Sequence, residues 1–267
     1  REIFSLSSAM SVRRMSIHCP RIFPDGFAPK QTRLEFDLER QADGFHLRRS
    51  SLVCDGIRVQ MTGSVKDLKT QDPFVAIRVA TEPATLTALR PVFPFGLLPT
   101  PVVAYIREHI QGGTFHLAQG TLQGRVSRIA AGLGRENSGD VLKARIHVEG
   151  GTLSHGSQMP LFTGIKGVLA VDGIDVSLQG MTGRFGRSPL TLDGAIRQAP
   201  RRGVTTFPFR ATIKAGNGEL AWLLGEEAVK SLSPQGILPI ELTGDGPLDA
   251  YRLEGEGDLS GMAYGYG

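Results

Sequence analysis

The chain has 267 residues, of which 40% are hydrophobic and 21% charged, which is enough to bury the core of one or two ordinary domains. A formal net charge of +4, with arginine pairs that have no interleaved aromatic residues, favours solvated surface over nucleic-acid binding. The sequence has no apolar run long enough for a membrane-spanning helix, and its 34 glycines and 16 prolines favour many short strands.

Residues 1–31 are predicted to be the N-terminal strands and loop of a truncated preceding unit. The segment from Ile3 to Met10, followed by Val12, indicates one or two strands, and the prolines after Cys19 indicate a loop. Because the pattern starts in mid-strand at Arg1, we expect the chain to be a fragment, with a membrane anchor in the missing N-terminal part.

Residues 32–124 are predicted to form a first β-repeat with a short helix. Apolar and polar residues alternate with a period of two, and Asp43-Gly44 is a hairpin signal between two such runs. The apolar positions chosen from these runs are Phe36, Leu38, Val59, Met61, Ile77 and Val79. From Val102 to Gln111 the spacing becomes helical, with Gly112-Gly113 as a stop signal.

Residues 125–140 are predicted to be a polar loop, and residues 141–267 a second β-repeat with a helix. The alternation returns in this part, with the helix expected between Glu219 and Leu232. Its chosen apolar positions are Leu178, Leu192, Phe209 and Ile213.

The two repeats share one pattern. An offset of 131 residues superimposes similar residues, in the pairs Val59 and Leu190, Met61 and Leu192, and Gly63 and Gly194. For the following strand the offset becomes 134, which aligns Val79 with Ile213. One architectural unit is therefore expected twice, each copy extending the sheet that its neighbour offers.

About a dozen strands with one apolar face each are too many for two short helices to cover. Such a sheet can fold into a closed sandwich, pair with a partner, or curl into an open groove that holds something apolar. The repeat and the scarcity of covering elements favour the groove, so we expect a mainly β fold: an elongated, curved antiparallel sheet forming an open apolar groove, interrupted by short helices. The ten apolar positions named above are expected to line it.

Catalytic, metal and cofactor sites are not predicted. The six histidines show no spacing typical of metal ligands, and His116 and His147 alternate with apolar residues, which places them on the polar face. Cys19 and Cys54 are expected to be isolated buried thiols, with one disulfide as the alternative. Trp222 is expected to pack the second helix onto the open end of the sheet, with an interfacial lipid anchor as the alternative.

The phrase GVLAVDGIDVSLQGMTGRFGRSPLTLDGAI resembles the recurring strand phrase of the AsmA-like envelope proteins of the YhdP type, and PVVAYIREHIQGGTFHLAQGTLQG resembles their short helix and returning strands. The resemblance covers the chain from about Leu34 to Leu259. It implies a β-groove repeat protein in the Gram-negative periplasm, anchored in the inner membrane and shielding phospholipid acyl chains for transport between the inner and outer membranes during outer-membrane biogenesis. The alternative is a structural or assembly module that engages outer-membrane protein partners, as in the more distantly similar TamB. The resemblance implies no enzyme activity.

Overall fold

The structure, a computed structural model, describes residues 4–20, 22–98, 100–130, 141–199, 204–232 and 234–265. It is mainly β, with 59% of the residues in strands and 14% in helices. This confirms the predicted fold class of an antiparallel sheet interrupted by short helices.

Most strands are eight to sixteen residues long, and turns of a few residues connect many consecutive pairs. The strands are β1 (Ser5–Arg13), β2 (Gln31–Arg40), β3 (Phe45–Cys54), β4 (Ile57–Lys66), β5 (Phe74–Thr81), β6 (Ala84–Thr85), β7 (Ile110–Arg125), β8 (Leu142–Leu153), β9 (Phe162–Asp172), β10 (Asp175–Phe185), β11 (Ser188–Ala199), β12 (Val204–Thr206), β13 (Phe209–Ala215), β14 (Pro234–Gln235), β15 (Leu238–Asp245), β16 (Arg252–Gly257) and β17 (Ala263–Tyr264). The helices are α1 (Leu86–Leu89), α2 (Thr100–His109), α3 (Val126–Ala130), α4 (Asn217–Leu224) and α5 (Glu226–Leu232), with 3-10 turns η1 (Phe95–Leu97) and η2 (Leu248–Ala250).

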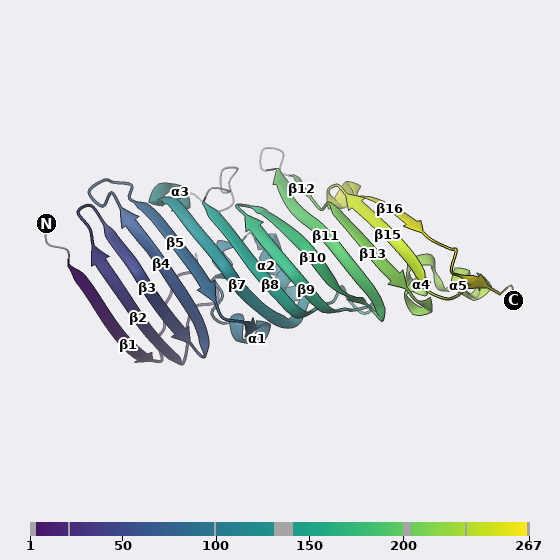
Figure 1. The fold of residues 1–267 in the computed structure, drawn as a ribbon, viewed down its shortest axis with the longest axis horizontal. Helices are drawn as coiled ribbons and strands as arrows, with labels where there is room; N and C mark the ends of the chain where they lie inside the picture. The colour runs from purple at the N-terminus through teal and green to yellow at the C-terminus, as the bar shows by residue number, and fades with distance from the viewer. Residues whose placement is uncertain are drawn as a thin grey trace. The chain divides into compact units, whose positions relative to one another are not determined.

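Fifteen of these strands belong to one antiparallel sheet that is not closed (Figure 1). The hydrogen-bonded order is β1-β2-β3-β4-β5-β7-β8-β9-β10-β11-β13-β15-β16, with β6 paired to β7 and β12 paired to β11. Strands β14 and β17 form a separate two-stranded sheet. Because sequence neighbours are mostly sheet neighbours, the fold follows directly from a series of hairpins.

The chain divides into two compact units. Unit 1 comprises Arg1–Tyr105, Thr114–His147 and Ala170–Ile174, and unit 2 comprises Ile106–Gly113, Val148–Leu169 and Asp175–Gly267. Unit 1 contains the strands from β1 to β6 and most of β7, and unit 2 contains the strands from β10 to β17.

The hairpin of β3 and β4 in unit 1 has a counterpart in β10 and β11 of unit 2. Asp55 and Gly56 connect the first pair with positive φ angles of 47° and 89°, and Gly186, with φ of 61°, lies in the second connection. The pairing of β3 with β4 shifts between Leu47 and Ser50, and that of β10 with β11 shifts between Leu178 and Met181. Both the turn and the bulge therefore recur at positions related by the offset read from the sequence.

The third strand of each repeat is paired differently from the sequence alignment. Thr81 stands opposite Val59 in unit 1, and Ile213 stands opposite Leu190 in unit 2. By strand pairing, the counterpart of Ile213 in the first repeat is therefore Thr81 and not Val79. The change is an even number of residues, so the apolar side chains stay on the same face.

The helices differ from their predicted bounds. Helix α2 ends at His109, and Ile110 already begins β7. Helix α3 occupies part of the predicted polar loop, whose residues 131–140 lie outside the described residues. The single helix expected after Glu219 is two short helices, α4 and α5, separated by Gly225 with φ of 91°.

The N-terminal region forms one strand, β1, where one or two were expected, and Ile3 lies outside the described residues. In the following loop, Ile17 and Phe27 form an isolated bridge. Both cysteines are free: Cys54 is buried at the end of β3, and Cys19 is half-buried in the loop. The alternative of a disulfide is therefore wrong for this structure.

Candidate functional site

Strand register places all six predicted residues of unit 1 on one side of its sheet, because opposed residues of antiparallel strands project to the same side. One row of opposed residues crosses five neighbouring strands: Leu38, Leu47, Gly63, Ile77 and Leu122. A second row beside it is Phe36, Ser50, Met61, Val79 and Gly120. Val59 lies next to Met61 on the same side and stands opposite Leu52. We call this side the apolar face of unit 1.

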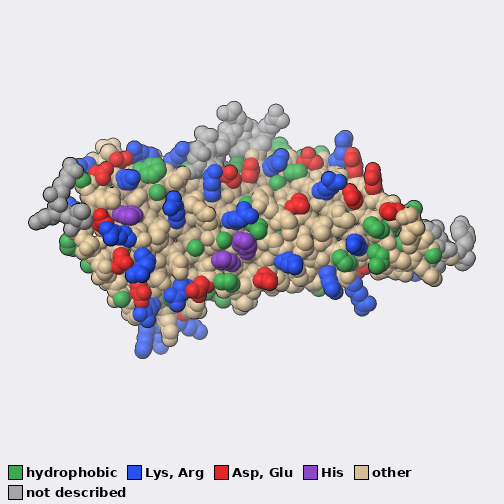
Figure 2. All heavy atoms as spheres, viewed as in Figure 1, with side chains coloured by type: hydrophobic (Ala, Val, Ile, Leu, Met, Phe, Trp, Pro, Cys, Tyr) green, Lys and Arg blue, Asp and Glu red, His purple; other side chains and the backbone are tan. Residues whose placement is uncertain are grey.

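The other side of the same strands is polar. Figure 2 shows lysine, arginine, aspartate, glutamate and histidine side chains spread over the viewed side of the sheet. Several of them form exposed ion pairs within or between neighbouring strands: Arg33 with Glu35, Arg49 with Asp37, and Arg58 with Glu82. Such pairs add little stability, but their charged groups keep this side of the sheet hydrated. The helices α1 and α2 lie behind the strands in Figure 1, away from this polar side.

Unit 2 has an apolar face of the same kind. Leu192 stands opposite Met181 on β10 and Ala211 on β13, and Phe209 stands opposite Gly194 and Gly244. The four predicted residues Leu178, Leu192, Phe209 and Ile213 all project to this side. The opposite side of the same strands carries Thr191, Asp193, Arg210, Glu241 and Glu254. The alternation read from the sequence thus corresponds to two chemically different sides.

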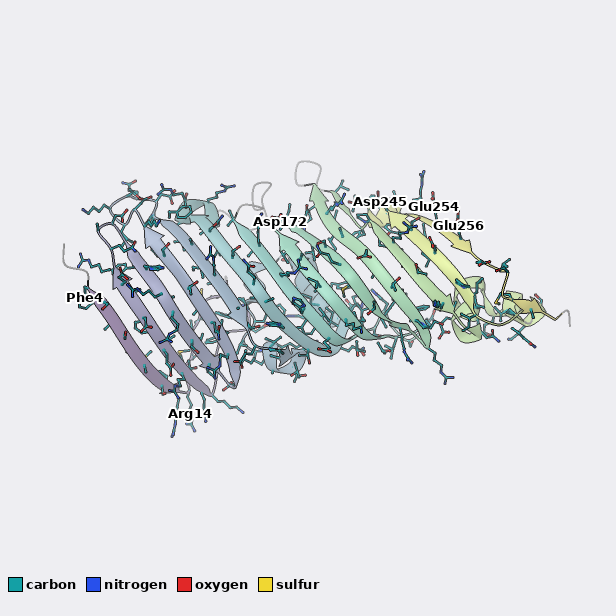
Figure 3. The ribbon with its side chains drawn as sticks, in the orientation of Figure 1. Phe4, Arg14, Asp172, Asp245, Glu254 and Glu256 are labelled. Carbon is teal, nitrogen blue, oxygen red and sulfur yellow. The ribbon has the colours of Figure 1, made fainter. Side chains whose placement is uncertain are left out.

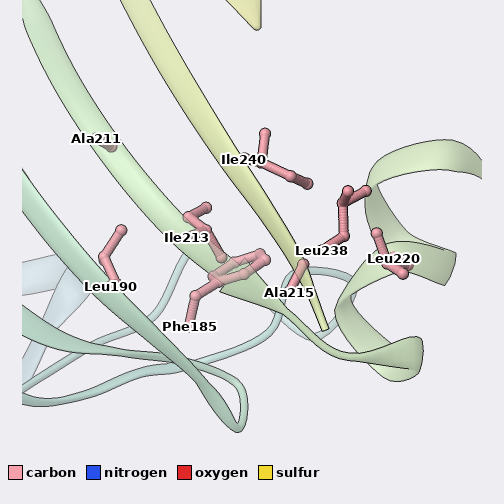
Figure 4. Close-up of a cluster of buried hydrophobic side chains, with 8 residues drawn as sticks. All are labelled: Phe185, Leu190, Ala211, Ile213, Ala215, Leu220, Leu238 and Ile240. Atoms are coloured by element: carbon pink, nitrogen blue, oxygen red, sulfur yellow. The ribbon is translucent and has the colours of Figure 1, made fainter. Parts of the chain in front are cut away.

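One end of the apolar face of unit 2 is closed by a packed core (Figure 4). The buried cluster consists of Phe185, Leu190, Ala211, Ile213, Ala215, Leu220, Leu238 and Ile240. Leu220 comes from α4 and is fully buried, and the Trp222 ring packs edge-on against Phe185 at 5.1 Å between ring centroids. Trp222 therefore packs α4 onto the end of the sheet, as the sequence predicted, although 43% of the residue remains exposed.

A buried carboxylate fixes α4 in this position. Glu219, which is 7% exposed, accepts hydrogen bonds from the Arg187 backbone N–H at 2.8 Å and from the Ser188 hydroxyl at 2.7 Å. The Ser188 oxygen in turn accepts the Gly216 N–H at 3.0 Å, at the start of the helix. Burial by itself raises the pKa of Glu219, but these hydrogen bonds outweigh it and hold the pKa below its ordinary value.

Gly186, in the turn between β10 and β11, leaves room for this carboxylate. A Cβ at this position would overlap the Glu219 Oε1 atom, and the φ of 61° is itself unfavourable for other residues. The hairpin is therefore attached to α4 by three residues acting together: Gly186, Ser188 and Glu219.

Unit 1 also has buried side chains at the turn between β3 and β4, namely Cys54 and Ile57. Phe27 in the N-terminal loop, Leu86 in α1 and Phe95 in η1 are buried as well. Burial raises the pKa of the Cys54 thiol, as expected for a structural cysteine without reactive character. The η1 turn is tied to the N-terminal loop by a hydrogen bond from Gly96 N–H to the Ile22 carbonyl at 2.9 Å.

Most of the residues predicted to line the apolar faces stay partly accessible to solvent. Nine of the ten predicted residues are half-buried, and only Ile213 is buried, at 5% exposed. Towards the edge strand β1 the exposure increases, to 42% at Leu6 and 49% at Met10. Leu253 on the edge strand β16 is 59% exposed. Apolar side chains in this state can bind an apolar molecule without any rearrangement of a packed core.

The prediction for Ile213 needs qualification, since its side chain contributes to the core under α4 and is not on the open surface. Sequence reasoning also left out residues that share the apolar face, namely Leu6, Met10, Leu47, Leu52, Leu122 and Leu253. None of them lies on a strand that carries a chosen residue, so they are identified by strand pairing, which places each opposite the apolar side of a neighbouring strand.

The described residues contain no group of three or more histidine, cysteine, aspartate or glutamate side chains that could hold a metal ion. Two pairs of histidines do lie close together: His109 and His155, with ring centroids 4.4 Å apart, and His116 and His147, with centroids 5.7 Å apart. In the first pair, the His109 Nδ1–H donates to the Ser154 carbonyl at 2.8 Å.

Among the helices of the described ranges, none has both the length and the apolar character needed to cross a membrane. Comparison of the chain with family models, curated proteins and solved structures gave no match. The two apolar faces and the resemblance noted in the sequence are therefore the features that bear on function.

Proposed function

We propose that the chain is a segment of an AsmA-like envelope protein that shields phospholipid acyl chains on the apolar faces of its sheet during transport between the inner and outer membranes. The observation that carries the proposal is the one-sided sheet of unit 1. On its apolar face Phe36, Leu38, Met61 and Val79 are half-buried and stay partly accessible to solvent. The resemblance to AsmA-like proteins supports the same function and a periplasmic location.

The dimensions of the open face suit an acyl chain. Five neighbouring strands at ~4.8 Å per strand span roughly 19 Å along a row such as Leu38 to Leu122. An extended phospholipid acyl chain is about 15 Å long, half the thickness of the hydrocarbon core of a bilayer. One row can therefore cover the length of one chain.

The energetics also favour an acyl chain over water on this face. Each methylene removed from water contributes about 0.8 kcal/mol, so burying even one side of several methylenes stabilises a bound chain by several kcal/mol. Small residues alternate with the larger ones along both rows, namely Ser50 and Gly120 in the second row and Gly63 in the first.

The test is native mass spectrometry of protein purified in mild detergent and of protein incubated with vesicles of phosphatidylethanolamine and phosphatidylglycerol. Met61→Glu places a carboxylate on the apolar face with little change in side-chain length, and we expect it to reduce bound phospholipid at least about tenfold. The matched control is Gln60→Glu, which introduces the same residue on the polar side of β4 and should leave lipid binding unchanged.

Wild-type protein with no bound phospholipid in either preparation would refute the proposal. So would equal lipid binding by the two variants, because the apolar face would then not be the binding surface. Circular dichroism of both variants shows whether each keeps the β-sheet signal of the wild type.

A second function, as an assembly module that pairs its edge strands with outer-membrane protein partners, is favoured by a different observation. Strands β1 and β16 lie at the two ends of the strand order, and nearly all of their residues are exposed. Figure 3 shows Phe4 beside β1, and Asp245, Glu254 and Glu256 along β15 and β16. Crosslinkers at Met10 and Glu254 would capture a protein partner on this hypothesis, whereas the lipid hypothesis predicts lipid adducts on the apolar faces.

A further inference from the structure

The histidines His116 and His147 come from neighbouring strands and lie side by side on the polar side of unit 1. His116 is on β7 and His147 is on β8, and these strands are adjacent in the sheet. Their ring centroids are 5.7 Å apart and their ring planes are inclined by 31°. His147 is exposed and His116 is half-buried.

This separation suits two imidazoles that bind one metal ion. With zinc–nitrogen bonds of about 2.0–2.1 Å, each ring centroid lies ~3.2 Å from the metal. Two such rings at a tetrahedral angle have centroids ~5.2 Å apart, and at a linear angle ~6.4 Å apart. The observed 5.7 Å lies between these limits, so the distance between the rings fits two ligands of one ion.

The surroundings leave this position accessible and electrically balanced. His147 is exposed, and Arg145 and Glu149 flank it two residues away on the same strand, one cation and one anion. The strands themselves are held by backbone pairing, so the two rings are presented from a rigid base and not from a loop. No further protein ligand joins the pair within the described ranges, so water molecules would complete the coordination.

We propose that His116 and His147 bind one divalent transition-metal ion, of the zinc, copper or nickel class, as a two-histidine chelate that links β7 to β8. Imidazole ligands select these ions over magnesium and calcium, which prefer oxygen. The ion sits on the polar side of the sheet, away from the apolar face, so this site is independent of lipid binding. The sequence did not reveal it, because the two histidines are far apart in the chain and meet only through strand pairing.

The experiment is titration of the full chain with Zn²⁺ by calorimetry, and with Cu²⁺ by electron paramagnetic resonance. Wild-type protein should bind one ion per chain in a saturable manner, and the Cu²⁺ spectrum should show nitrogen coupling. His116→Ala and His147→Ala should each weaken binding at least about tenfold, since even loss of a supporting residue outside the ligand set has an effect of this size. The double variant should bind at most about threefold more weakly than either single variant, because a single remaining histidine cannot chelate the ion.

His46→Ala removes a lone histidine from β3 and should leave the titration unchanged. His155→Ala removes one member of the other close pair and distinguishes the two possible sites. The proposal is overturned if His155→Ala abolishes binding while His116→Ala does not, or if wild-type protein shows no saturable binding below about 1 mM Zn²⁺. Because both substituted residues are on the solvated side, circular dichroism should show an unchanged fold. If an alanine variant misfolds, His147→Gln, which keeps the polar side chain, must show the same loss of binding.

Discussion

Two aspartate substitutions on neighbouring strands distinguish the closed and open parts of the apolar face in unit 2. Ile213 is 5% exposed and belongs to the buried cluster under α4, whereas Leu192 is half-buried at the rim of that cluster. Ile213→Asp places an unpaired carboxylate where water cannot reach it, at a cost of about 3–5 kcal/mol. Burying a leucine side chain fully stabilises a protein by about 1.5–3 kcal/mol, and Leu192 is only half-buried, so Leu192→Asp should cost ~1 kcal/mol of hydrophobic stabilisation. Water can solvate the new carboxylate at this position.

The measurement is urea unfolding followed by circular dichroism. Free energies of unfolding are compared with the same dependence on urea concentration (m value) for all variants. Since whole domains are stable by about 5–15 kcal/mol, Ile213→Asp should unfold unit 2 at low urea or in its absence, whereas Leu192→Asp should remain folded. Leu192→Asp should nevertheless reduce phospholipid binding on the apolar face of unit 2, because the carboxylate lies on the path of an acyl chain. Equal destabilisation by both changes would refute the reasoning, since it would show that the apolar face is a filled core throughout.

Three further predictions concern the attachment of α4 to the hairpin and a hydrogen bond elsewhere in unit 2. Because the pKa of Glu219 is lowered in the folded state, its contribution to stability is present above the ordinary value of 4.5 and is lost as the pH falls through the lowered pKa. Glu219→Gln should therefore make the free energy of unfolding less dependent on pH in this acid range. Urea unfolding measured from about pH 3 to 7 tests this. Gly186→Ala should destabilise unit 2 more than Gly180→Ala, because both residues have positive φ and cost about 1–2 kcal/mol for it, but only at Gly186 does the new methyl group displace Glu219; equal melting temperatures would contradict this. Tyr251→Phe should cost about 1 kcal/mol in thermal unfolding, since the hydroxyl donates a 2.7 Å hydrogen bond to the Phe207 carbonyl, and no change would show that this bond contributes nothing.

Strand alternation determined most of what could be predicted from the sequence. The period of two identified the apolar side of each strand, and register then brought these sides together, as for Leu38 and Ile77. These features are local or depend only on parity, so they need no knowledge of tertiary packing.

What the sequence could not predict depends on contacts between distant segments. Gly112-Gly113 was interpreted as a helix stop, but Gly113 lies within β7, where a Cβ would come within 2.8 Å of the Gly151 Cα on the neighbouring strand. The glycine is required for close approach of two backbones and not to end a helix. Ile213 was likewise assigned to the open surface because the position of α4 over it is not encoded in the alternation.

The two histidine pairs illustrate the same limit for a binding site. Spacing along the chain excluded a metal site by the motifs that helices and loops use. Strand pairing nevertheless brings His116 within 5.7 Å of His147, measured between ring centroids. A search of the sequence for cross-strand pairs requires knowledge of the strand register, which the alternation of apolar residues alone does not give.

The most direct test of lipid shielding is photo-crosslinking with p-benzoylphenylalanine at paired positions on the two sides of the sheet in unit 1. Phe36 and Val79 project to the apolar face, whereas their chain neighbours Asp37 and Arg78 project to the polar side. After irradiation in cells or with phospholipid vesicles, mass spectrometry should find phospholipid adducts at Phe36 and Val79 and none at Asp37 and Arg78. Adducts of equal yield on both sides, or protein adducts alone at Phe36 and Val79, would contradict the account.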